Sequence, residues 1–125
     1  MIKSLIIAGG VAALAMTATA AFAGECTDDQ QSQAGMLAAG VGKDAVSKVV
    51  AVTGKQMVNI ESCDFRGGNF VVDFKYNFLA ADGLYWVEVS AKFDQSGGGA
   101  TSKVTKSSPN MAAAEAKAGV KLAAN

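Results

Sequence analysis

A period-two recurrence of large apolar residues between positions 70 and 79 is the feature that most constrains the fold of this chain. Large apolar side chains stand at every second position, namely Phe70, Val72, Phe74, Tyr76 and Phe78. A period of two is typical of a β-strand that buries one of its faces. The pattern therefore predicts a strand with one face in a core and the other face directed outward.

Asp82-Gly83 follows this strand, and this dipeptide favours a two-residue hairpin turn. The stretch from Leu84 to Asp94 is then the return strand. With Asp82 and Gly83 as the turn residues, the predicted pairs are Phe78 with Val87, Tyr76 with Val89, Phe74 with Ala91 and Val72 with Phe93. This register makes every pair on the inner face apolar, and it puts Leu79 opposite Trp86 on the outer face.

A strand from Met57 to Phe65 precedes the hairpin, and the Arg66-Gly67-Gly68-Asn69 turn joins the two. Its pattern changes phase, because Val58 and Ile60 favour one face whereas Cys63 and Phe65 favour the other. Either a β-bulge near Glu61-Ser62 restores a common face, or Cys63 lies at the sheet edge. With a short edge strand between 100 and 108, the sheet is a three- or four-stranded antiparallel meander.

A helical segment precedes the sheet. Thr27 and Gln30 fit a capping box, and small or apolar residues recur near the helical period as far as Val52. Thr53-Gly54 is the expected stop, with Gly54 in the left-handed cap position. The β-branched stretch from 46 to 52 leaves a strand open as an alternative.

Gly40 and Gly42 interrupt this helical pattern. A straight helix from 27 to 53 would be about 40 Å long, whereas a strand from Met57 reaches Cys63 after only about 20 Å. A Cys26–Cys63 bridge needs the two Cα atoms within about 6 Å. We therefore expect a break near Gly40–Gly42 that gives two helices, packed on one face of the meander in an α+β fold.

The N-terminus has the features of a secretory signal peptide. Lys3 supplies the positive charge, an apolar run extends from Leu5 to Ala21, and Ala21-Phe22-Ala23 is a cleavage site. The alternative, a transmembrane anchor, is disfavoured by the Ala- and Gly-rich composition and the cleavage motif. The predicted division is a signal peptide at 1–23, a single domain at 24–108 and an Ala-rich tail or weak helix at 109–125. After signal removal we expect no transmembrane segment and a periplasmic or extracellular location.

The sequence contains two cysteines, Cys26 and Cys63, and no histidine. In an oxidising compartment such a pair predicts one disulfide. A metal site would need further Cys or His ligands, and a thiol nucleophile would lack an imidazole base, so no metal, cofactor or catalytic residue is expected. The formal net charge of zero gives no electrostatic reason to expect nucleic acid or an anionic membrane as partner.

The outer face of the hairpin supplies the candidate binding surface, which consists of Val71, Leu79, Leu84 and Trp86. Trp86 is the only tryptophan in the chain, and aromatic anchors rimmed by charges mark interfaces. The alternative is that the tail, the fourth strand or a second chain covers these residues. The sequence favours a small exported, non-enzymatic binding or accessory protein with an unidentified protein partner. A self-associating structural or assembly component of the cell envelope is the second hypothesis, and a histidine-free enzyme is the third.

Overall fold

The structure is a computed structural model and describes residues 25–123 of the chain. The predicted signal peptide lies outside these residues. The elements in chain order are α2 (Asp28–Val46), β2 (Gln56–Arg66), β3 (Asn69–Ala80), β4 (Gly83–Asp94), β5 (Thr101–Ser107) and α3 (Pro109–Ala118). Within 25–123, no helix is long and apolar enough to cross a membrane.

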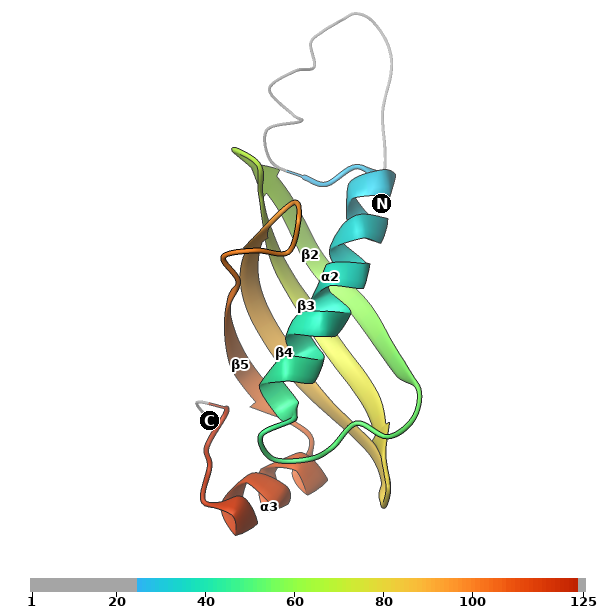
Figure 1. The fold of residues 1–125 in the computed structure, drawn as a ribbon, viewed down its shortest axis with the longest axis vertical. Coiled ribbons are helices and arrows are strands. Elements are labelled where there is room, and N and C mark those ends of the chain that lie inside the picture. Colours follow the sequence, from blue (N-terminus) through green and yellow to red (C-terminus); the bar gives the residue numbers. More distant parts are fainter. Residues whose placement is uncertain (1–24, 124–125) are drawn as a thin grey trace, which may run out of the picture.

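The four strands form one antiparallel sheet in the order β2-β3-β4-β5, which confirms the predicted meander. Helix α2 crosses one face of this sheet, and α3 lies at the end of the sheet where β5 stops (Figure 1). The α+β class with a helix on one face is therefore confirmed. We call the sheet face under α2 the inner face and the opposite one the outer face.

The core lies between α2 and the inner face. From α2 it takes a narrow stripe of mostly small residues at four-residue spacing, Ala34, Ala38, Gly42 and Val46. From the sheet it takes large side chains, of which the fully buried ones are Phe70, Val72, Phe74, Tyr76, Phe78, Val87, Val89 and Phe93. Because the helix stripe is small, α2 can lie close to the aromatic rings of β3.

The predicted helix break near Gly40–Gly42 is wrong, since α2 is one continuous helix from Asp28 to Val46. The distance argument failed because it assumed a helix as long as Thr53. Nineteen residues span only about 28 Å, and the strand from Gln56 to Cys63 spans about 26 Å, so a straight helix lets the cysteines meet. The helix ends where the β-branched residues begin, with neither the strand at 46–52 nor the Gly54 cap that the sequence indicated.

The predicted hairpin register is wrong by two residues. Ala81 and Asp82 form the turn, and the observed pairs include Leu79 with Leu84, Phe78 with Tyr85, Tyr76 with Val87 and Phe74 with Val89. A shift of two leaves every side chain on its predicted face, so the facing was right although the pairs were not. The Tyr85 hydroxyl donates to the carboxylate of Asp82, and its ring stacks on Phe78 with centroids 5.5 Å apart. Both contacts favour the observed register.

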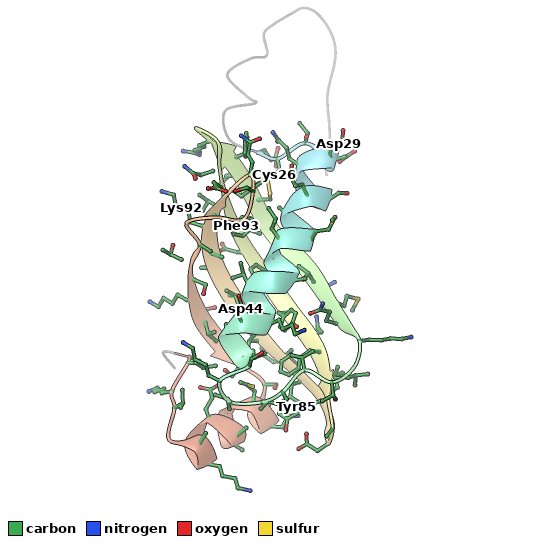
Figure 2. The ribbon with its side chains drawn as sticks, viewed as in Figure 1. Cys26, Asp29, Asp44, Tyr85, Lys92 and Phe93 are labelled. Atoms are coloured by element: carbon green, nitrogen blue, oxygen red, sulfur yellow. A yellow bond between two sulfur atoms is a disulfide. The ribbon has the colours of Figure 1, made fainter. Side chains whose placement is uncertain are left out.

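Strand β2 contains the expected bulge, where the register with β3 shifts between Ile60 and Ser62. Beyond the bulge Cys63 is buried, and it forms the predicted disulfide with Cys26, with Cα atoms 5.5 Å apart. Figure 2 shows this bridge at the start of α2. The Cys26 backbone N–H also donates to the Cys63 carbonyl at 3.0 Å. The disulfide and this hydrogen bond therefore together hold the segment before α2 against β2.

The C-terminal region forms the helix α3. Ser108 caps it, Pro109 begins it, and Gly119 ends it at a φ of 71° in the left-handed region. Met111 is fully buried in the main core. The chain then runs back to β5, where Ala123 bridges Val104 in parallel.

Candidate functional site

The outer face of the sheet carries no described element, because α2 lies on the inner face and α3 at one end (Figure 1). Its side chains form rows across the strands. Starting at the disulfide end, the rows are Arg66–Asn69–Asp94, Asp64–Val71–Lys92–Thr101, Ser62–Asp73–Ser90–Lys103, Asn59–Lys75–Glu88–Lys106, Met57–Asn77–Trp86 and Leu79–Leu84. The face therefore carries charges of both signs over four rows and is apolar at the end near the β3–β4 turn.

Four residues make up what we call the apolar end, namely Met57, Leu79, Leu84 and Trp86. The exposed fractions are 59% for Met57, 39% for Leu79 and 61% for Leu84, and Trp86 is half-buried. They come from β2, β3 and β4, and antiparallel pairing places them in two adjacent rows. Apolar side chains this exposed and this close together are typical of a contact surface.

Trp86 is held firmly at both its backbone and its ring. Its backbone N–H donates to the Ser108 hydroxyl at 3.2 Å, and its carbonyl accepts from the Ser108 N–H at 2.9 Å. The Lys75 ammonium lies 4.4 Å from the centre of the indole ring, a cation–π contact of about 0.5–1 kcal/mol at an exposed site. Trp86 is therefore presented in a fixed position on the sheet.

The structure brings together three of the four predicted surface residues, Leu79, Leu84 and Trp86. Val71 is 43% exposed on the same face, but it lies eight residues further along β3, about 27 Å from Leu79. Met57 belongs to the apolar end and was not predicted. The signal for it was the alternation in β2, which directs Met57 to the face opposite Val58.

The charged rows contain ordered polar contacts. The Asp73 carboxylate accepts from the hydroxyls of Ser62 at 3.0 Å and Ser90 at 2.6 Å. Lys75 in β3 is paired directly with Glu88 in β4, and Glu88 with Lys106 in β5. Asp73 is thus held by hydrogen bonds within the sheet, whereas Lys75 and Glu88 present opposite charges on the outer face.

A hollow lies between α3 and the C-terminal segment, with a volume of about 310 Å³. Glu115 lines it and is 5% exposed. One oxygen of its carboxylate accepts from the Ser107 hydroxyl, and the other accepts from the backbone N–H groups of Leu122 and Ala123. This carboxylate therefore fastens the C-terminal segment to α3 and β5.

Acidic groups elsewhere also have local roles. Hydrogen bonds from the Ser96 hydroxyl and from the backbone N–H groups of Gly98 and Ser96 lower the pKa of Asp94, and they close the β4–β5 loop. Among residues 25–123, no three His, Cys, Asp or Glu side chains are grouped so that they could hold a metal ion.

Comparisons of the chain with models of protein families, with curated proteins and with solved structures find no match.

Proposed function

We propose that this chain is a small exported, non-enzymatic binding or accessory protein that acts through the apolar end of its outer sheet face. One observation carries the proposal. The large apolar side chains of β3 and β4 on the inner face are buried under α2, while three large apolar residues on the other face remain 39–61% exposed around the single tryptophan. A partner that covers them gains the free energy of their burial, about 25 cal/mol per Å².

The position of Trp86 supports this proposal. Tryptophan is among the residues that most often dominate the binding energy of an interface, and such anchors are surrounded by contacts that exclude water. Leu84 lies two residues before Trp86 in β4, and Met57 lies in the same row beyond the polar Asn77. Lys75 and Glu88 supply a charged rim on one side. Since the Lys75 ammonium already lies over the indole ring, the Trp86 side chain is partly ordered before binding and loses less side-chain entropy when a partner covers it.

Export is part of the proposal. It rests on the signal-peptide pattern of residues 1–23 and on the Cys26–Cys63 disulfide, since such bonds persist in oxidising compartments. Intact-mass measurement of the exported protein tests it. We expect a chain that begins at Gly24 and whose mass is lower than that of its reduced form by two hydrogen atoms. A chain that retains Met1 would remove the export claim.

The decisive experiment measures binding and stability in parallel. Trp86→Ala should abolish the capture of a partner from the exported fraction by the immobilised protein. Met36→Ala is the matched control, because Met36 is 78% exposed on α2 and faces away from the sheet. Capture that is equal for the wild type and both variants would contradict the proposal.

Stability shows whether the loss of capture is specific. Val87 is fully buried next to Trp86 in β4, and Val87→Ala should cost about 2 kcal/mol or more of unfolding free energy. Trp86→Ala should cost clearly less, since part of the ring is already in water. Equal large losses for both variants would mean that Trp86 serves the fold and is not a binding residue.

A further inference from the structure

The free edge of β2 is covered at only one of its ends. At the disulfide end, Glu25 pairs with Asp64 beside the strand. The other edge strand, β5, is covered by Ala123, which bridges Val104, and it carries two exposed lysines. Among residues 25–123, no element lies beside the first half of β2, residues 56–60 (Figure 1). This stretch is therefore an open sheet edge.

The sequence of this edge does nothing to discourage pairing. Natural sheets protect their open edges with lysine, proline, bulges or covering segments. Residues 56–60 are Gln-Met-Val-Asn-Ile, without charge or proline, and the bulge comes after them. Met57 is exposed on the outer face, and Val58 and Ile60 are only partly buried on the inner face. A further strand at this edge would cover apolar side chains on both faces of the sheet.

The register shows which backbone groups point outward at this edge. The Leu79 N–H donates to the carbonyl of Lys55, which lies opposite Leu79, at 2.9 Å. Hydrogen-bonded and non-hydrogen-bonded positions alternate along an antiparallel pair. Lys55 and every second residue after it, as far as the bulge, therefore bond to β3. The N–H and C=O groups of the residues between them, Gln56, Val58 and Ile60, point away from the sheet.

We propose that a second copy of this chain pairs with this edge in antiparallel fashion, with Val58 opposite Val58 on a two-fold axis perpendicular to the sheet. Gln56 of each copy then lies opposite Ile60 of the other. Every outward N–H group of these residues meets an outward C=O group of the other copy. A shift of two residues in either direction leaves some of these groups without a partner. The inference goes beyond the proposed function, because it concerns the sheet edge and not the outer face.

The charges that flank this edge select a second copy as its occupant. Lys55 lies three residues before Val58 and Glu61 three residues after it, and both side chains are exposed. A symmetric dimer buries the same patch on both copies, so the patch must complement itself. In the proposed register each Lys55 lies opposite the Glu61 of the other copy. Parallel pairing of the same edges would bring Lys55 beside Lys55 and Glu61 beside Glu61, which repulsion disfavours.

The surroundings of the edge leave room for this pairing. The N–H groups of Thr53 and Gly54 donate to the Leu79 carbonyl, so the chain before Lys55 turns toward β3 and does not run on past the edge. An axis perpendicular to the sheet keeps the inner faces of both copies on the same side. The two sheets therefore join into one continuous sheet with both α2 helices on one face, and Val58 packs on Val58 across the axis.

The first test reverses the charges and measures self-association by sedimentation equilibrium of the purified protein. Lys55→Glu and Glu61→Lys each replace two attractions of the dimer by two repulsions, so each should weaken it by about tenfold. An equimolar mixture of the two variants should dimerise about as well as the wild type, because each pair then joins opposite charges. Lys103→Glu, on the opposite edge strand, is the matched control and should have no effect.

Rescue by mixing can arise only between copies. Lys55 and Glu61 are six residues apart, about 20 Å along the strand, so they do not contact each other within one chain. A loss of stability inside a variant chain would persist in the mixture. Recovery of the dimer in the mixture therefore reports contact between Lys55 of one copy and Glu61 of the other.

Hydrogen exchange locates the paired residues. The amides of Met57 and Asn59 face β3, so they should be protected at every protein concentration. The amides of Gln56, Val58 and Ile60 face outward, so they should gain protection only as the wild-type protein is concentrated and the dimer forms. In Lys55→Glu this gain should move to higher concentration.

A proline variant removes the centre of the pairing. Because the Val58 N–H points outward, Val58→Pro leaves the ladder with β3 intact. It removes the central hydrogen bonds between the copies and should abolish the dimer. Ser102→Pro is the matched control on β5. Ser102 lies opposite Ala91, whose backbone faces β3, so its N–H also points outward.

Three results would overturn the inference. The first is a wild-type chain that stays monomeric at millimolar concentration, and the second is a dimer that the charge reversals leave unchanged or that mixing does not rescue. The third is a dimer that Trp86→Ala abolishes and Val58→Pro does not, which would place the interface on the outer face. A dimer at the β2 edge together with partner capture that does not depend on Trp86 would support the inference and refute the proposed function.

Discussion

Gly42 of α2 lies directly against the ring of Tyr76 of β3. A Cβ atom built on Gly42 would be 2.5 Å from the Tyr76 Cγ, closer than any real contact. Gly42 is buried and Tyr76 is fully buried beneath it. The glycine therefore lets the backbone of α2 lie directly against the Tyr76 ring. The helical pattern is interrupted at this position for packing, and the helix runs through it without a break.

Substitution of the two helix glycines should have opposite effects. Gly42→Ala inserts a methyl group into the Tyr76 ring and should cost about 1–3 kcal/mol of unfolding free energy. Gly40→Ala should stabilise by up to about 1 kcal/mol, because its Cβ would meet no atom within 4 Å and alanine favours the helix. Chemical denaturation of the two variants checks this. If both variants changed the free energy of unfolding by the same amount, Gly42 would not pack against Tyr76.

The end of α2 shows what the sequence leaves undetermined. The capping box at Thr27 and Gln30 is present as predicted, because it depends on residues three apart. The C-terminal end depends on how much helix the sheet below can cover. The sequence pattern continued to Val52, yet Val49, Val50 and Val52 pack on the core from a turn. Apolar periodicity shows that a segment is buried, but tertiary packing decides where its helix stops.

Tyr76 should make the fold sensitive to alkaline pH. Burial raises its pKa to about 12, whereas a tyrosine of the unfolded chain titrates near pH 10. The unfolded state therefore loses its proton first, so the free energy of unfolding should fall as the pH rises from about 10 to about 12. Below pH 10 this contribution is fully present.

Denaturation midpoints between pH 8 and pH 12, with absorbance at 295 nm to follow tyrosinate, measure this effect. The Tyr76→Phe variant should show a shallower decline. Some decline should remain, because the hydrogen bond from Tyr85 to Asp82 also raises the pKa of Tyr85. If the free energy of unfolding of Tyr76→Phe fell with pH as steeply as that of the wild type, Tyr76 would not be the group responsible.

The sequence predicts which face of the sheet the candidate site occupies, but not which residues are neighbours in it. Alternation assigns Leu79, Leu84 and Trp86 to the outer face, and a register shift of two residues cannot change that. The same shift does change neighbours, so Trp86 lies opposite Asn77 and not opposite Leu79. Two-residue shifts conserve the pattern, and only contacts such as that of Tyr85 with Asp82 distinguish them. Which residues gather at one end of a face is therefore a property of the register.

Removal of the disulfide should cost much of the stability of this small domain. The cysteines are 37 residues apart, and a loop of that length corresponds to about 4 kcal/mol in the chain-entropy model. The Cys26→Ser/Cys63→Ser double variant should therefore unfold at markedly lower denaturant concentration. Titration of the denatured, unreduced wild-type protein should find no free thiol. Two titratable thiols would show that the bridge does not form in the exported protein.

Glu115 should control the C-terminal segment. Its carboxylate accepts three hydrogen bonds, from Ser107 and from the backbone N–H groups of Leu122 and Ala123. Glu115→Ala leaves these donors without their acceptor and should cost about 2–3 kcal/mol. The matched control Ser107→Ala removes one donor and leaves two bonds in place, so it should cost about 1 kcal/mol.

Hydrogen exchange of the Leu122 and Ala123 amides tests the local effect. Both amides should lose protection in Glu115→Ala and keep most of it in Ser107→Ala, because only the first variant removes the atom that holds them. Unchanged protection of both amides in Glu115→Ala would show that the bridge between Ala123 and Val104 alone keeps the segment on β5.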